Sequence, residues 1–448
     1  MPGGRVLAIS LIAAAPAAAL AGAPPQLAFP GAEGAGRFAA GGRGGRVITV
    51  TSLADAGPGS LREAVEANGP RTIVFAVDGT IKLSKPLRIV QPNITIAGQS
   101  APSGGITLRD YPLEVDADDV VIRFIRSRLG DESKTESDAI WIVGGHRIIL
   151  DHVSASWSVD ETLSASANYT KPEQGFYDLT VQWSIIADSL THSLHAKGEH
   201  GYGSLIRGGR GSKISFHHNL WANHEARMPR PGNYSGPDVD PLGAFFDFRC
   251  NVFYNWGKAY SGYNADKATL ARYNFVNNSY VAGPQSVKPI AFNESNALAH
   301  AFFAGNSMNG TVPADPWSLV SGLQSPGYRL DRPVDVGPVA CESAASSYAL
   351  VLAFAGASRS RDAVDLRIVE GVKTRTGKQI DTQGEDGGWP DLAKGKAPAD
   401  RDRDGMPDAW ERAHGLNPAK DDSASDADGN GYTAIEDYLN SLVPAPRA

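Results

Sequence analysis

Short segments that are either apolar throughout or alternate between apolar and polar residues return along most of the chain. Each is bounded by Gly, Asn, Asp or Ser, and a period of two or a short β-branched run predicts a strand. The copies occupy residues 94–96, 120–125, 148–153, 179–184, 214–219 and 246–251, and a last copy ends near Asn274. They follow one another at intervals of 23 to 35 residues. Helical periodicity between them is weak, so the crossover helices of a parallel α/β sheet are not expected.

A strand that repeats at this spacing without helices is typical of stacked coils. We therefore predict an all-β fold, a parallel β-helix, for residues 28–300. Asn219 and Asn251 end adjacent copies at matching places, and stacked amides there would satisfy backbone groups of the turns. A β-sandwich is also rich in short strands, so it remains open as the alternative.

The strand pattern fades after about residue 300. Residues 348–354 and 362–372 have helical character, with Gly356 and Gly371 as candidate ends. The partly helical segment 301–372 is expected to pack on the coils or to cap them. The polar, Gly-rich segment 373–396 is interpreted as a linker.

The first 23 residues predict a secretory signal peptide, and hence a secreted protein. Arg5 gives a positive start, residues 6–20 are apolar and rich in Ala, and the small residues at 19–23 suit cleavage. The apolar run is too short to favour a membrane anchor, and no other segment predicts a membrane span. Export would permit a disulfide between Cys250 and Cys341, but their spacing leaves a disulfide and two buried thiols equally open.

The net charge of the chain is −7, and residues 391–448 contribute −5 of it through 12 acidic and 7 basic residues. The remainder is close to neutral. Nucleic-acid recognition normally requires a basic face, so no nucleic-acid partner is expected.

The acidic tail contains two segments that match a twelve-residue calcium loop, with side-chain oxygens at fixed positions and Gly at position six. The candidate ligands are Asp400, Asp402, Asp404, Asp408 and Glu411 in the first loop, and Asp426, Asp428, Asn430 and Asp437 in the second. Residues 407–414 and 433–439 look helical, as the motif requires. We predict an EF-hand-like or dockerin-like calcium module at 397–441, with a structural or adhesive role. A disordered acidic tail is the alternative, and a dockerin-type protein partner is a further use of such a module.

Five motifs follow one another in the main body. They are Phe-Pro-Gly-Ala-Glu-Gly at 29–34, Gly-Pro-Gly-Ser-Leu-Arg at 57–62, Asp-Ala-Ile at 138–140, Asp-His at 151–152, and the stretch from His218-Asn219 to the Arg-x-Pro at 227–229. In this order they resemble the secreted pectate lyases of polysaccharide lyase family one, over residues 29–284. The resemblance implies a right-handed parallel β-helix, in agreement with the repeats.

The resemblance also implies an activity, the calcium-assisted β-elimination of polygalacturonate by a monomeric enzyme. A cation is needed because the C5 proton of a uronate lies beside a carboxylate whose charge opposes its removal. The implied Ca²⁺ ligands are Asp138 and Asp160, with Glu161 as a third candidate. A further acid often follows in the family, but Ser164 stands at that place here.

Arg227 matches the Arg before x-Pro that acts as the catalytic base in the family. Pro229 stiffens this loop, and an alkaline working pH is expected because a guanidinium normally stays protonated. The family's second Arg is replaced by Gly232, so Arg230 is the candidate that grips a uronate carboxylate. Lys197 and His200 are looser substrate-binding candidates. The remaining histidines of the motifs, His152, His217 and His218, are expected to be structural.

Three other functions remain open. A polygalacturonase-type hydrolase would need paired carboxylates at a defined separation, and Asp118-Asp119 is the only Asp-Asp doublet of the body. A non-catalytic polysaccharide-binding β-helix is the second, because fold alone does not imply activity. A lyase of methylated pectin is the third, and it would not need the acidic cluster.

Overall fold

The computed structural model describes residues 25–443, so the predicted signal peptide lies outside the described residues. Within them the chain forms a solenoid whose coils each contribute a strand to two or three parallel faces. This confirms the predicted parallel β-helix and excludes the β-sandwich, since every paired strand of the faces runs parallel to its neighbour. No helix among residues 25–443 is long and apolar enough to cross a membrane.

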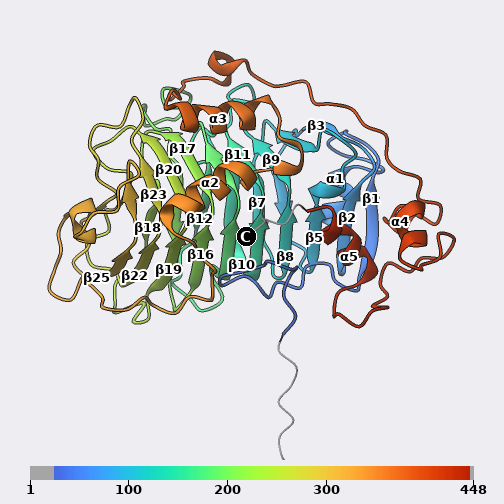
Figure 1. The fold of residues 1–448 in the computed structure, drawn as a ribbon, viewed down its shortest axis with the longest axis horizontal. Coiled ribbons are helices and arrows are strands. Elements are labelled where there is room, and N and C mark those ends of the chain that lie inside the picture. Colours follow the sequence, from blue (N-terminus) through green and yellow to red (C-terminus); the bar gives the residue numbers. More distant parts are fainter. Residues whose placement is uncertain (1–24, 444–448) are drawn as a thin grey trace, which may run out of the picture.

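Three faces run along the solenoid, and Figure 1 shows their strands side by side along the long axis. The first face consists of β1 (Arg46–Val50), β2 (Arg71–Phe75), β5 (Ile94–Ala97), β8 (Val120–Arg123), β10 (Ile140–Asp151), β13 (Phe176–Gln182), β16 (Lys213–His217), β19 (Ala244–Arg249), β22 (Ala271–Val276) and β25 (Ala299–Ala304). The second face consists of β3 (Gly79–Lys82), β6 (Ile106–Arg109), β9 (Ile125–Arg128), β11 (Ser154–Ser156), β14 (Ile185–Ala187), β17 (Leu220–His224), β20 (Val252–Trp256), β23 (Ser279–Val281) and β26 (Ser307–Met308).

The third face is the one that carries the candidate site. It consists of β4 (Leu87–Ile89), β7 (Leu113–Asp116), the first residues of β10, β12 (Leu163–Ser166), β15 (Leu205–Arg207) and β18 (Arg230–Gly232), and of a separate set formed by β21 (Gly262–Asn264), β24 (Phe292–Glu294) and β27 (Val320–Gly322). The strands therefore continue beyond residue 300, where the sequence pattern fades. The reason is that a strand such as Ala299–Ala304 contains no β-branched residue and consists of Ala, His and Phe instead.

A ladder of buried asparagines marks the bend between the first and second faces, as predicted. Asn219 donates its side-chain amide to the carbonyl of Val181, and its backbone N–H donates to the side-chain oxygen of Asn251 on the next coil at 2.9 Å. Asn278 and Asn306 repeat this arrangement on the two following coils. Each amide satisfies backbone groups that the bend leaves without strand partners, so the bend can be buried.

The interior of the solenoid is filled by columns of aromatic side chains. Phe216, Phe248, Phe275 and Phe303 follow one another on the first face, with ring centroids 6.1, 5.1 and 4.8 Å apart. Because register is parallel, equivalent residues of successive coils meet, and the same residue type can stack at each level. Packing of this kind fixes the coils rigidly and leaves the turns free to vary.

Helices lie outside the coils. They are α1 (Leu61–Glu66), α2 (Ala344–Phe354), α3 (Ala363–Thr374), α4 (Asp408–Ala413) and α5 (Ala434–Ser441), with short 3₁₀ turns η1 (Gly98–Ser100), η2 (Pro316–Leu319), η3 (Ser358–Ser360) and η4 (Gln383–Asp386). The two helices predicted between 348 and 372 are thereby confirmed as α2 and α3. Cys250 and Cys341 form a disulfide, so the alternative of two buried thiols is excluded. The bond ties the returning chain, which is the segment that follows the last coil and carries α2 and α3, to the solenoid.

The returning chain is also held by buried charges. Arg128 donates to Asp362 and Asp365 at 2.9 Å, and these side chains are at most 2% exposed. The segment 373–396, interpreted as a linker, leads from α3 to the C-terminal module and lies against the coils. Gln379 donates to the carbonyl of His224, and Trp389 packs edge-on against Trp157.

The C-terminal module packs on the first coils, and Figure 1 shows α4 and α5 beside β1 and β2. Met406, Ile435 and Tyr438 form a small core with Val74 and Ala97 of the solenoid. Arg43 pairs with Glu436 at 2.9 Å across this contact. The predicted helices at 407–414 and 433–439 are confirmed as α4 and α5.

Candidate active site

Four turns at the edge of the third face bring the site residues together. They precede β10, β12, β15 and β18, and they carry Asp138, the Asp160–Glu161 pair, Tyr202 and Arg227 respectively. Isolated parallel bridges join Glu161 to Tyr202 and Tyr202 to Ala226, so three successive turns are in register. Residues far apart in sequence thus become neighbours because the coils stack.

The three carboxylates predicted as Ca²⁺ ligands form one cluster. Asp138, Asp160 and Glu161 each offer an oxygen within 4.8 Å of the others, and Asp138 accepts the backbone N–H of Glu161 at 3.1 Å. Burial, and then the charge of Asp160, raises the pKa of Asp138 well above its usual value. A cluster in which one carboxyl resists ionisation is a place where a cation is electrostatically favourable.

Ser164 does not replace the acid that the family often has at its position. Its hydroxyl hydrogen-bonds to Asp138, and both residues line a cleft of about 250 Å³ together with Trp141, Leu205 and Tyr234. The cation cluster therefore consists of the three carboxylates, and Ser164 holds one of them.

Arg227 faces the carboxylates from the next turn. Its guanidinium forms an ion pair with Glu161 and lies 4.3 Å over the ring of Tyr202, and Nε donates to the hydroxyl of Tyr263 at 3.4 Å. The side chain is 15% exposed. Its backbone has φ +62°, an unusual conformation for a residue other than Gly and one that clusters at functional sites. The arginine is thus held at the rim of the cluster, accessible to a ligand.

Arg230 lies on β18 and forms an ion pair with Asp266 at 3.5 Å. Arg207 on the neighbouring strand β15 contacts the same carboxylate at 2.9 Å. A side chain at Gly232 would place its Cβ 2.0 Å from the carboxylate of Asp266, so the position of the family's second Arg cannot hold one here. Arg207 and Arg230 form a pair of guanidinium groups beside the cleft instead.

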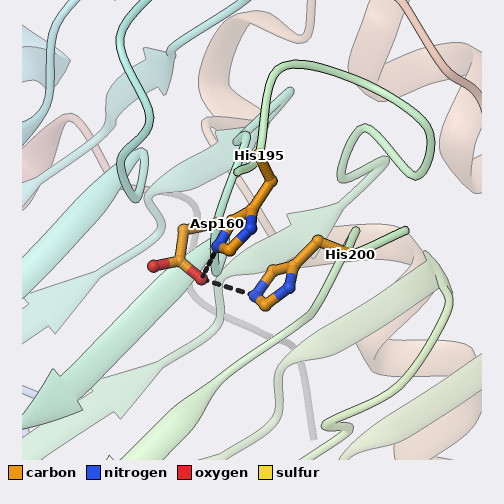
Figure 2. A group of neighbouring side chains, drawn as sticks. All are labelled: Asp160, His195 and His200. Atoms are coloured by element: carbon orange, nitrogen blue, oxygen red, sulfur yellow. Dashed lines mark ion pairs between the residues drawn. The ribbon is translucent and has the colours of Figure 1, made fainter. Parts of the chain in front are cut away.

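His200 is buried, so its ring is little accessible to a substrate. Figure 2 shows it with His195 against Asp160, from the loop between β14 and β15. Nε2 of His200 is 2.6 Å from Oδ1 of Asp160, and the ring is 5% exposed. Burial raises the pKa of Asp160, but the nearby imidazole of His200 outweighs this and leaves the pKa lowered. Lys197, in the same loop, is exposed to solvent.

The other histidines of the motifs are part of the bend. His152 stacks between Phe124 and Trp183, and its Nδ1 lies 2.9 Å from Asp151. His218 stacks on Trp183 at 4.2 Å. Burial and the charge of His218 lower the pKa of His217 well below its usual value. These side chains fill the bend far from the turns that carry Arg227, as expected for structural residues.

The sequence missed several residues of the site. Glu136, Tyr202, Tyr263, Asp266, Arg207 and His195 are the ones that the structure adds. They come from turns of uneven length on different coils, so no spacing in the sequence relates them. The only available signal was the polar composition of segment 192–200, which identifies a loop but not its contacts.

The first C-terminal loop brings its acids together as predicted. Asp400, Asp402 and Asp404 lie within 4.8 Å of one another. Glu411 is 0% exposed, and both its carboxylate oxygens are without a hydrogen-bond partner among the described residues. Burial and neighbouring acids raise the pKa of Glu411 to about 7 and that of Asp404 to about 6. Such a buried, unpaired carboxylate fits a divalent cation.

The remaining candidate ligands of the C-terminal module already have hydrogen-bond or ion-pair partners. Asp408 is already paired with Arg412 at 2.9 Å. In the second loop Asn430 donates to Asp428 at 2.9 Å and to Asp437 at 3.2 Å, and Gly431 N–H donates to Asp426 at 3.1 Å. The second loop therefore has the turn of a calcium loop, but its side chains are exposed and satisfy one another.

Comparison with known proteins agrees with this geometry, although no family model matches the chain. The chain is 36% identical over 432 residues to a probable pectate lyase C of Aspergillus terreus, covering 94% of each protein. It is 36% identical over 429 residues to a probable pectate lyase C of Aspergillus fumigatus, again with 94% of each covered. Because 94% of the chain is matched, the unmatched residues are fewer than those of the C-terminal module, so the matches include at least part of that module.

Solved structures match the fold. A pectate lyase bound to a hexasaccharide has a TM-score of 0.52 and 15% identity, covering 75% of this chain and 98% of that chain. The major allergen from cedar pollen has a TM-score of 0.52 and 18% identity, covering 71% and 91%. With two close relatives matched along nearly their whole length, the chain belongs to the pectate lyase family and is a polysaccharide lyase.

Proposed function

We propose that this enzyme is a secreted, calcium-dependent lyase that cleaves polygalacturonate by β-elimination and releases unsaturated oligogalacturonates. The single observation that carries the proposal is the position of Arg227, which faces the Asp138, Asp160 and Glu161 carboxylates from the adjacent turn. The names of the fungal relatives support pectate as the substrate.

The three carboxylates are the residues that would hold Ca²⁺ at this site. When bound, the cation neutralises a uronate carboxylate and stabilises the negative charge that develops as the neighbouring C–H bond breaks. The raised pKa of Asp138 supports this assignment, because burial and the neighbouring charge of Asp160 both disfavour its ionised form unless a cation is present.

Arg227 acts on the sugar as the base in its neutral form, which alkaline pH favours. It takes the proton from C5 and becomes a guanidinium, the electron pair left behind forms the C4–C5 double bond, and the bond from C4 to the glycosidic oxygen breaks. Glu161 and Tyr202 hold the side chain in place. The leaving oxygen takes a proton from solvent, and the guanidinium then returns its proton to solvent. Positioning is valuable here because a misplaced base loses most of its effect.

Arg207 and Arg230 would bind a second uronate carboxylate along the cleft. Guanidinium groups match carboxylates in a two-bond geometry, and Asp266 holds the two guanidinium groups side by side. Lys197 and His200 remain looser candidates for substrate contact. His200 is the less accessible of the two, because it is buried against Asp160.

The C-terminal module is proposed to bind structural calcium through Asp400, Asp402, Asp404 and Glu411. Its helices face the solenoid through Ile435 and Tyr438, and the ion would brace this contact. This use is favoured over a dockerin-type partner, since the apolar side of the module is occupied by the enzyme's own coils. Asp408, and the second loop with Asp426, Asp428, Asn430 and Asp437, would contribute less because its side chains are already paired.

A single assay tests the lyase. The enzyme is incubated with polygalacturonate, with calcium or with chelator, and the absorbance of the unsaturated product is followed. We expect calcium-dependent absorbance that rises toward alkaline pH. Arg227→Ala should lower kcat on the order of 10²–10⁴-fold, whereas Arg329→Ala, an exposed arginine at the far end, should change little. Reducing ends without absorbance would identify a hydrolase, and activity only on esterified pectin would identify a pectin lyase.

A further inference from the structure

A second group of metal-ligand atoms lies directly behind the carboxylate cluster. Nε2 of His200 and Nε2 of His195 approach the same carboxylate oxygen of Asp160, at 2.6 and 3.6 Å (Figure 2). Nε2 of His195 is also 3.3 Å from Oε1 of Glu136. The two imidazoles are 2% and 5% exposed, whereas the carboxylates open toward the cleft at 34% and 41%.

We propose that Asp160, His195, His200 and Glu136 form a site for a borderline divalent cation such as Zn²⁺, separate from the calcium ligands Asp138 and Glu161. Two imidazoles and two carboxylates are the donors that such ions prefer. Calcium takes oxygen donors, so the histidines would discriminate between the two ions.

The geometry fits an ion better than a simple histidine–aspartate hydrogen bond. Although His200 Nε2 lies close to Asp160, its N–H does not point at an acceptor with hydrogen-bonding geometry among the described residues. A proton would lie on the line between the two atoms, whereas a metal lies to the side of it. With metal–ligand bonds of about 2.0–2.1 Å, ligand atoms are separated by roughly 3.0–3.4 Å. The observed separations of 2.6, 3.3 and 3.6 Å bracket that range.

The surrounding contacts hold both imidazoles beside the carboxylates. The rings of His195 and His200 are stacked at 3.6 Å and nearly parallel, and His200 leans on Tyr202 at 3.9 Å. A metal lies close to the plane of each imidazole that binds it, so one of the two rings must tilt before both Nε2 atoms can bind one ion. The backbone N–H of Ala196 donates to Glu136 at 2.9 Å, which joins the histidine loop to the turn that carries this acid.

One local contact must change. The backbone N–H of Lys197 donates to Nδ1 of His195 at 3.1 Å, and a neutral imidazole that binds a metal through Nε2 carries its proton on Nδ1. Residues 196–199 are exposed, so this amide can turn to water when the ion binds. The rearrangement is confined to the loop and leaves the coils unchanged.

The shared carboxylate links this site to the calcium cluster. Asp160 belongs both to the histidine group and to the group with Asp138 and Glu161. Two dications on one carboxylate repel each other, so occupation of the histidine site should weaken calcium binding at the cluster. This consequence rests on the proposed function, whereas zinc binding itself does not.

Titration calorimetry of the calcium-free full-length protein with Zn²⁺ tests the proposal, because calcium on the shared Asp160 would oppose zinc binding. We expect one zinc ion per chain whose binding depends on the two histidines. His195→Gln and His200→Gln should each weaken the affinity on the order of 10-fold or more. Glu136→Gln, whose side chain is 41% exposed, should weaken it severalfold. His192→Gln is the matched control, because His192 lies in the same loop and is 63% exposed.

Two further readouts keep the test decisive. At a cobalt concentration that half-saturates the wild type, Co²⁺ should give similar visible absorption bands in the wild type and in the His192 variant, and weaker bands in the other three. In the lyase assay, zinc should raise the calcium concentration needed for half-maximal activity, less so in Glu136→Gln. Absence of zinc binding, or binding that the three variants leave unchanged, overturns the proposal. Zinc binding by a protein without lyase activity would instead overturn the proposed function.

Discussion

The carboxylate cluster beside Arg227 and the cluster in the first C-terminal loop have similar ligands but different counter-charges. Asp160 and Glu161 face Arg227, His195 and His200, which partly neutralise them. In the C-terminal loop, Glu411 is buried with both oxygens unpaired among the described residues. The first cluster can therefore stay folded without an ion and receive it together with an acidic substrate. The second is expected to need an ion to hold its charges together.

The difference follows from where each cluster lies. The first is built on turns of rigid coils, so the solenoid supports it whether or not an ion is present. The second is built on short loops and on α4, whose buried residues are the acids Asp408 and Glu411. A catalytic ion and a structural ion are thus expected to have separable effects, and the following predictions test that separation.

The largest expected effect is on activity. Asp160→Asn should lower kcat/KM on the order of 10²–10³-fold at saturating calcium, because it removes a ligand from the charge-stabilising cluster. Asp404→Asn removes a comparable carboxylate from the C-terminal loop and should leave kcat unchanged. Product absorbance measures both. Equal losses in the two variants would mean that the clusters are not separable.

The second effect is on stability. Calcium at 100 times its dissociation constant should add about 2.7 kcal/mol to the free energy of unfolding, seen as a rise in Tm. Glu411→Gln should remove most of this rise, whereas Asp138→Asn should keep it. Calorimetric scans with calcium and with chelator provide the measurement. A rise that survives in Glu411→Gln would place the structural ion elsewhere.

The third effect is the pH dependence of the chelated protein. The pKa of Glu411 is raised from 4.5 to about 7 in the folded chain, so its contribution to stability is present below pH 4.5 and is lost as pH rises through 7. After allowance for solvent screening we expect a loss of about 1–2 kcal/mol across this window. Glu411→Gln should flatten this part of the Tm profile. A chelated wild type that gains stability over the same range would contradict the assignment.

The smallest effect concerns the contact between module and solenoid. Arg43→Ala removes the ion pair with Glu436 and the donation to the Leu27 carbonyl, and it should cost about 0.5–1 kcal/mol in urea unfolding. Arg46→Ala, nearby and outside this contact, serves as the control. No difference between the two variants would mean that the module does not brace the first coils.

The sequence predicted the scaffold well because parallel coils repeat their chemistry. The strand copies at 120–125, 148–153 and 179–184 appear as β8, β10 and β13, and Asn219 and Asn251 form the expected ladder. The last coils were missed because a strand such as Ala299–Ala304 lacks the β-branched residues of the earlier copies. The Cys250–Cys341 disulfide could not be foreseen, since it depends on how the chain returns along the solenoid.

The sequence alone therefore determined the repeat, the helices of the tail, and the residue types at the Arg-x-Pro turn and the calcium loops. These are local patterns, set by side-chain periodicity and loop spacing. Only the tertiary structure decided that Glu161 meets Arg227, that Asp266 occupies the space beside Gly232, and that His195 and His200 converge on Asp160. Such contacts form when turns of unequal length from different coils are stacked. Stacking aligns the strands in register, but it places no constraint on the length of the loops, so the sequence has no period that relates the residues of different loops.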